Sequence, residues 1–238
     1  MSTVTIVFPD VGPLITLAKA DALEFLLAFS DEIRLVLTDV VEFEATRFRS
    51  DHQDAQKICD FISANSGRLT IEGTTYGKQA ISAAKARQRY DESPEVQAFF
   101  AANQILPPVK MAVDCGELSI VSFVADMIGA PPGPPCLVIA EDDFFLRANS
   151  GALPGNAHII STAAFLKALE VLNPNCNAKS VFDAAASAGR RANNAEVDKT
   201  AGKIKGGTTW REAIDPQKLK ESIAARRKRL EIARKNKP

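Results

Sequence analysis

The feature that most constrains the fold is an apolar run near the start of the chain that leads into an amphipathic helix. Residues 4–8 (VTIVF) form a β-branched and aromatic run, which is typical of a buried parallel strand. Pro9 ends this strand, and Gly12 with Pro13 opens a helix. The apolar side chains of that helix fall on one face: Leu14, Leu17 and Ala18. Asp10 therefore lies at a strand's carboxyl end, where open α/β sheets bind ligands, although an acid there is equally expected to cap the helix.

The length and composition indicate a globular protein with room for one large domain, or for one domain and an extension. The chain has 238 residues, of which 46% are hydrophobic and 24% charged, so it can bury a full core. It has no apolar run of membrane-spanning length and no basic-then-apolar signal peptide, so we expect a cytoplasmic protein without a membrane partner. The four cysteines lack CxxC spacing, which favours buried free thiols over zinc ligands or disulfides.

The net charge of zero hides an uneven distribution along the chain. Residues 1–195 contain 16 Lys and Arg against 23 Asp and Glu, whereas residues 196–238 contain 13 against 6. The body is therefore acidic and the tail basic. Such an asymmetry indicates a polyanionic partner or an acidic protein surface.

Hydrophobic periodicity predicts an alternation of strands and helices after the first unit. Strands are expected at residues 33–37, 69–72, 136–140 and 157–160, and helices at 22–29, 52–65, 114–127 and 161–172. Thr38 or Asp39 caps another helix, which carries Glu42 and Glu44. Glu42 is interpreted as solvent-facing, and a solvated helix charge is one account of Glu44.

Two further groups of acidic residues are candidate site residues. Asp114 and Glu117 have the i, i+3 spacing that places both on one face of a first helical turn, where they repel each other unless a cation or the helix N-terminus compensates. A cap followed by a first-turn acid is the rival account. The second group, Glu141, Asp142 and Asp143, ends a strand, and three adjacent acids there are hard to explain by stability alone.

Taken in order, these pieces resemble the PIN-domain nucleases, and most closely the branch related to toxins of the VapC type. The resemblance rests on four segments, which are Asp10 to Lys19, Asp39 to Glu44, Asp114 to Ile120 and Leu137 to Arg147. It covers roughly residues 4–172. It implies an α/β fold, a PIN-like three-layer sandwich with a mostly parallel central sheet, formed by residues 1–172 with a helical insertion at about 75–110.

The resemblance also implies a catalytic site. Its catalytic acids would be Asp10, Glu44, Glu117 and Asp142, and its metal ligands would be the same four with Asp114 and Asp143, while Glu141 is a further helper. Hard oxygen ligands without His or Cys suit Mg²⁺ or Mn²⁺, which would activate water for attack on a phosphodiester. Arg147 matches a basic residue common in the family and, by that resemblance, would contact nucleic acid. One departure is clear, because Val11 and Gly12 stand where PIN proteins usually have Ser or Thr.

Basic residues outside the acidic site are candidates for nucleic-acid contact. In the insertion, Lys85, Arg87, Arg89 and Tyr90 could touch phosphates, although a solvated helix face explains them slightly better. Residues 173–238 are expected to form a basic, partly flexible extension with a linker at 173–180, a short helix at 181–191 and a long terminal helix from Asp215. The terminal helix carries the cluster Arg226, Arg227, Lys228 and Arg229 and could pack on the body, bind a second copy or hold RNA.

The sequence thus favours a Mg²⁺- or Mn²⁺-dependent endoribonuclease, with RNA as substrate. By resemblance it would be the toxin of a toxin–antitoxin pair, with an antitoxin protein as partner and a homodimer as its assembly. A rival from another class is a catalytically weak PIN scaffold that binds RNA or a protein through its basic tail. A different Mg²⁺-dependent phosphate chemistry, such as a phosphatase, is a third reading, disfavoured because Asp10-Val-Gly12 lacks the second Asp of a DxD loop.

Overall fold

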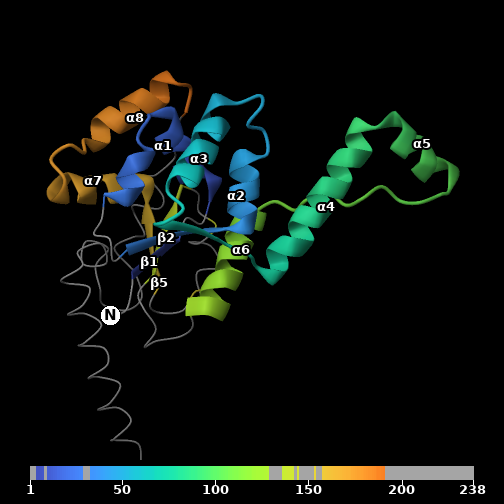
Figure 1. The fold of residues 1–238 in the computed structure, drawn as a ribbon, viewed down its shortest axis with the longest axis horizontal. Coiled ribbons are helices and arrows are strands. Elements are labelled where there is room, and N and C mark those ends of the chain that lie inside the picture. The colour runs from blue at the N-terminus through green and yellow to red at the C-terminus, as the bar shows by residue number, and fades with distance from the viewer. Residues whose placement is uncertain are drawn as a thin grey trace, which may run out of the picture.

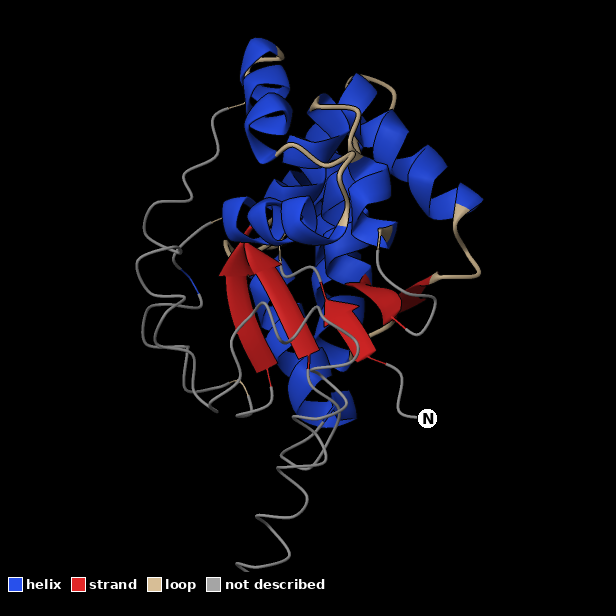
Figure 2. Ribbon diagram, turned by 90° about the vertical axis from the view of Figure 1, so that its left-hand side faces the viewer, coloured by secondary structure: helices blue, strands red, loops and turns tan. Residues whose placement is uncertain are grey.

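A single parallel sheet organises the protein. The computed structural model describes residues 4–7, 10–28, 33–128, 136–141, 144, 153 and 157–190. The strands are β1 (Val4–Val7), β2 (Ile33–Thr38), β3 (Leu69–Glu72), β4 (Cys136–Ala140) and β5 (Ala157–Ser161), in the order β3-β2-β1-β4-β5. Every pairing is parallel, so the carboxyl ends of the strands meet at one edge (Figure 2). The predicted α/β class with a parallel sheet is confirmed, while the finer PIN-like sandwich stays a prediction.

The strand order places two loops beside each other. Val7 of β1 pairs with Val36 of β2 on one side and with Val138 of β4 on the other. The chain runs outward from β1 through β2 to β3 and then returns to the other side of β1, so the order reverses between β1 and β4. In open α/β sheets such a reversal leaves a crevice outside the carboxyl ends of the two strands. Asp10 and Glu141, which follow β1 and β4, stand at that crevice.

The helices pack their apolar faces on the sheet and on one another. They are α1 (Val11–Lys19), η1 (Leu23–Leu27), α2 (Asp39–Thr46), α3 (Gln53–Ala64), α6 (Cys115–Phe123), η2 (Val124–Ile128), α7 (Thr162–Leu172) and α8 (Ala178–Ser187). All five residues of β4 are buried, as an apolar run in the middle of a parallel sheet requires. Within the described ranges, no helix is both long and apolar enough to cross a membrane.

Two of the predicted helices differ in form from the expectation. The segment expected as a helix over 22–29 is a five-residue 3₁₀ helix, η1, and the helix expected over 114–127 is α6 followed by one π-helical segment, η2. The cysteines are free thiols, as predicted, three of them buried and Cys59 half-buried.

Helix α8 is part of the packed body. It lies against α1 and α7, and its Ala178 and Val181 are buried in the same core as the sheet (Figure 1). Residues 178–187 fall within the segment 173–238 that was predicted as an extension, and α8 begins inside the segment predicted as a linker. The packed body therefore continues past residue 172. Residues 191–238, with the predicted terminal helix, lie outside the described residues.

A two-helix arm projects from the body. It consists of α4 (Thr75–Glu92) and α5 (Pro94–Ala102), so the segment predicted as a helical insertion at about 75–110 is helical over most of its length (Figure 1). Helix α5 has no buried residue, which agrees with its position away from the sheet. Ser93 joins the two helices and caps α5, because its hydroxyl accepts a hydrogen bond from the Val96 backbone N–H.

The base of the arm is fixed to the end of β2 by Asp39. The Asp39 carboxylate accepts hydrogen bonds from the backbone N–H of Thr74 at 3.2 Å and from its hydroxyl at 3.0 Å. The Thr74 hydroxyl oxygen in turn accepts from the N–H of Gly77 at 2.8 Å and caps α4. Asp39 lies so close to Gly77 that a side chain at position 77 would overlap the carboxylate.

We expect Gly77→Ala to destabilise the protein by about 1 kcal/mol, because the added methyl group displaces a carboxylate that accepts two hydrogen bonds. Gly67→Ala is the matched control, since nothing lies within 4 Å of a methyl group there. That substitution should be neutral or slightly stabilising, by up to about 1 kcal/mol. Urea unfolding of both variants measures the difference. Equal effects at the two glycines would contradict the anchoring role of Asp39.

Candidate active site

Asp10 and Glu141 come together at the crevice between β1 and β4. Asp10 is the N-cap of α1, and its Oδ1 accepts a hydrogen bond from the Val11 backbone N–H at 2.6 Å. The prediction that Asp10 caps this helix is therefore confirmed. Glu141 is buried and accepts hydrogen bonds from the Thr162 hydroxyl at 2.8 Å and from Arg190 Nη2 at 2.8 Å. The Arg190 Nε also donates to the Thr16 hydroxyl at 3.2 Å.

Gly12 occupies the space between these charged groups. A Cβ atom at position 12 would lie 2.7 Å from Asp10 Oδ2, 3.1 Å from Glu141 Oε2 and 3.2 Å from Arg190 Nη2. A serine or threonine therefore does not fit without displacing one of them. At position 12 the departure noted in the sequence thus has a physical reason, since Asp10, Glu141 and Arg190 surround the space that a hydroxyl side chain would need.

Glu44, in the second turn of α2, is close enough to Asp10 to be affected by its charge. The pKa of Glu44 is raised from its ordinary value of 4.5 to about 7, chiefly by burial and then by the negative charge of Asp10, while Arg47 opposes the shift. Its half-buried position excludes the simple alternative of a fully solvated helix charge. Glu42 is also half-buried and accepts a hydrogen bond from the Thr46 hydroxyl at 3.2 Å, so it is less solvent-facing than expected.

Glu117 approaches the same region from the first turn of α6, where it is buried. Tyr76, at the start of α4, forms a hydrogen bond with the Cys115 thiol at 3.1 Å. The pKa of Tyr76 is raised to about 12 by burial, by this bond and the Cys115 charge, and by the charges of Glu44 and Glu117. Both glutamates therefore act on one tyrosine hydroxyl, which places α2, α4 and α6 around a shared acidic region.

Asp114 does not join Glu117 on one face of a helical turn. It precedes α6 with a left-handed backbone (φ 63°), makes no side-chain cap and is exposed, whereas Glu117 is buried. The i, i+3 argument fails because it requires both residues to be helical. The alternative, a capping residue followed by a first-turn acid, is confirmed in part: Asp114 is at the N-cap position of α6, but its side chain makes no capping hydrogen bond.

The remaining predicted site residues lie outside the described part of the chain. They are Asp142, Asp143, Arg147, Arg226, Arg227, Lys228 and Arg229. Among the residues that are described, no three Asp, Glu, His or Cys side chains form a group able to hold a metal ion. Glu44 is thus coupled electrostatically to Asp10, and Tyr76 to both Glu44 and Glu117, but these described acids do not form a ligand set.

The donor chemistry of this region suits a hard divalent cation. Its acidic groups are carboxylates from β1–α1, α2 and α6, and carboxylate oxygen is the preferred ligand of Mg²⁺ and Mn²⁺. Burial is the main cause of the raised pKa of Glu44, and the negative charge of Asp10 adds to it; a bound cation would favour the ionised form of this carboxyl group. The type of donor therefore suits Mg²⁺ or Mn²⁺, although the described carboxylates do not by themselves form a group able to hold an ion.

Sequence reasoning missed Arg190 and Tyr76. Arg190 is separated from Glu141 by 49 positions, and no local pattern connects them. The only signal was Gly189, a helix-ending glycine with φ 80° that turns the chain back after α8. Tyr76 was included in the insertion without a role, although it begins α4 directly after the Thr74 cap.

Comparison with known proteins adds no relative, because no family model, curated protein or solved structure matches this chain. Fold and site together define an α/β protein whose parallel sheet carries an acidic region at its carboxyl edge.

Proposed function

We propose that this protein is a Mg²⁺- or Mn²⁺-dependent endoribonuclease. The observation that carries the proposal is the electrostatic coupling of acids from three separate elements at the carboxyl side of the parallel sheet: Asp10 raises the pKa of Glu44, and Glu44 and Glu117 both raise that of Tyr76. A carboxyl group whose pKa is raised by burial and by a second carboxylate is typical of a functional site. RNA as substrate, an antitoxin partner, a homodimer and a cytoplasmic location come from the PIN resemblance alone.

Each acid has a distinct part in this proposal. Asp10, Glu117 and Asp142 would hold the ion, which when bound supplies charge neutralisation at the phosphate and a more acidic water. Glu44 has a pKa of about 7, so it can accept a proton from an attacking water near neutral pH. Arg190 neutralises Glu141 and so limits the negative charge that Asp10 must face.

A calorimetric Mn²⁺ titration of wild type, Asp10→Asn and Asp21→Asn tests the site without a known RNA. Asn caps a helix as well as Asp does, so Asp10→Asn removes a charge and keeps α1 intact. Asp21, beyond the other end of α1, has φ 52°, which Asn also tolerates. We expect Asp10→Asn to weaken Mn²⁺ binding by at least about tenfold, since one charged ligand is lost.

The Asp21→Asn control should bind Mn²⁺ as the wild type does, and Asp142→Asn should behave like Asp10→Asn. A folded wild-type protein that takes up no Mn²⁺, or one whose binding is unchanged in Asp10→Asn, would rule out the proposed nuclease site.

The scaffold alternative draws on a specific observation. Glu141, the acid directly after β4, is already neutralised by Arg190 and is hydrogen-bonded to Thr162. A scaffold would bind RNA through residues 226–229 and would tolerate Asp10→Asn, whereas a nuclease would lose cleavage with that change. Cleavage and binding assays on the same variants therefore separate the two functions.

A further inference from the structure

A pocket lies directly beside the acidic region, between α2, α4 and the chain that returns from the arm. Its volume is about 400 Å³, within the range of small-molecule sites. The lining residues are Phe43, Glu44, Arg47, Phe48, Ala84, Arg87, Gln88, Asp91, Glu92, Lys110, Met111 and Ala112. Glu44 belongs both to this lining and to the acidic region, so a molecule in the pocket would adjoin the proposed reaction site.

One wall of the pocket offers flat surfaces for stacking. The Arg47 guanidinium carbon lies 4.7 Å from the centroid of the Phe48 ring and 5.9 Å from that of Phe43. Lys85 Nζ lies 5.8 Å from the Phe43 centroid. Phe48 is 45% exposed although it is a large apolar side chain. Aromatic rings and arginine guanidinium planes are the surfaces on which proteins stack unpaired bases.

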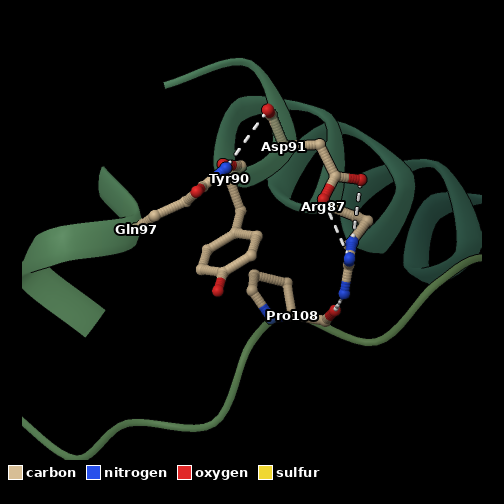
Figure 3. Close-up of polar contacts among 5 residues, drawn as sticks. All are labelled: Arg87, Tyr90, Asp91, Gln97 and Pro108. Carbon is tan, nitrogen blue, oxygen red and sulfur yellow. Dashed lines mark hydrogen bonds and ion pairs between the residues drawn. The ribbon is translucent and has the colours of Figure 1, made fainter. Parts of the chain in front are cut away.

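The opposite wall is held in place by the arm's own contacts (Figure 3). Arg87 forms an ion pair with Asp91 at 2.8 Å, and its Nη1 donates to the Pro108 carbonyl at 3.2 Å, which fastens the returning chain to α4. Gln97 Nε2 donates to the carbonyls of Tyr90 and Asp91, which joins α5 to the end of α4. Of the basic residues predicted on α4, Arg87 therefore shapes the pocket, whereas Lys85 and Arg89 are exposed and do not line it.

The charge of the lining argues for a base and against a simple phosphate site. Three basic side chains (Arg47, Arg87, Lys110) face three acidic ones (Glu44, Asp91, Glu92). Arg87 is committed to Asp91 and Pro108. A phosphate site needs a surplus of cations, whereas a nucleobase needs a stacking surface with donors and acceptors around its edge. Gln88 and Glu92, joined by a 2.7 Å hydrogen bond, supply such groups.

We propose that this pocket binds one unpaired nucleobase of a single-stranded RNA, stacked against Phe48 and Arg47, next to the acidic region. The inference rests on the proposed function, because it places the base beside the scissile phosphodiester. The insertion forms half of the pocket, so this chain's own arm selects unpaired RNA. A base inside a duplex could not enter, since its faces and its pairing edge are covered.

The test is fluorescence anisotropy of labelled single-stranded RNA homopolymers (A, C, G and U) with the full chain in EDTA, where no metal-dependent cleavage proceeds. An abasic oligonucleotide of the same length is the reference probe. We expect at least one homopolymer to bind more tightly than the abasic probe. Phe48→Ala should weaken that binding about tenfold, because a loss of this size is typical when one base–aromatic stacking contact is removed. Phe48→Trp should retain it.

Phe99→Ala is the matched control, because Phe99 is 59% exposed, lies on α5 and does not line the pocket. It should leave the affinity unchanged. The proposal is overturned if no homopolymer binds, if the abasic probe binds equally well, or if Phe48→Ala and Phe99→Ala have equal effects. If the protein binds no Mn²⁺ but its RNA binding still depends on Phe48, the nuclease proposal is rejected and the pocket proposal stands. If it binds Mn²⁺ but its RNA binding does not depend on Phe48, the pocket proposal is rejected and the nuclease proposal stands.

Discussion

Glu44→Gln is expected to stabilise the protein by about 2 kcal/mol near pH 8 and to have little effect near pH 4.5. The pKa of Glu44 is about 7 in the folded protein against an ordinary value of 4.5, so the folded state binds more protons than the unfolded state between these values. Stability therefore falls as pH rises through this window and is level above it. The difference between the two pKa values corresponds to roughly 3 kcal/mol in the free energy of unfolding. We reduce this figure to about 2 kcal/mol because the side chain is partly exposed.

Urea unfolding of the wild type and the variant at both pH values measures this effect. Glu95→Gln, at an exposed position of α5, controls for the loss of one negative charge. A stability gain that is the same at both pH values, or that Glu95→Gln reproduces, would contradict the assignment. The expected result would show that ionised Glu44 is held in the folded protein at a cost in stability, which is the kind of cost found at functional sites.

The sheet and the first acids could be predicted because their signals are local. The run Cys136–Ala140 is apolar throughout, and its burial on both faces follows directly. Asp10 was predicted from its position at a strand end, since parallel strands bring those ends to one edge, whereas Glu44 was predicted from the PIN resemblance. The same reasoning placed Glu141 at a strand end near Asp10, but it did not predict that Arg190 would neutralise Glu141.

The remaining features depend on contacts between distant segments or on backbone detail. Nothing in the sequence around Arg190 indicates that it reaches Glu141 and Thr16. The left-handed backbone of Asp114 could not be read from its neighbours, so the spacing argument failed there. Gly12 was noticed as a departure, but its cause requires the positions of Glu141 and Arg190 in space.

Arg190→Met is expected to destabilise the protein by about 3 kcal/mol, since it leaves the carboxylate of Glu141 buried without its counter-charge. The Glu141 side chain is 4% exposed and that of Arg190 is 30% exposed, so the loss should fall at the lower end of the range for buried pairs. The double variant with Glu141→Gln should regain most of it, because no buried charge then remains.

Lys179→Met is the control for Arg190→Met, because it breaks the Lys179–Asp183 pair on the same helix, whose side chains are 84% and 65% exposed. No measurable change is expected there, because such exposed pairs contribute little. Thermal and urea unfolding of the four proteins would decide the matter. A mild effect of Arg190→Met, or no recovery in the double variant, would mean that Arg190 is a surface contact and that Glu141 is stabilised by Thr162 alone. The expected result would instead make Arg190 the internal cation of the acidic crevice, the reason why Asp10 and Glu141 can stand side by side there.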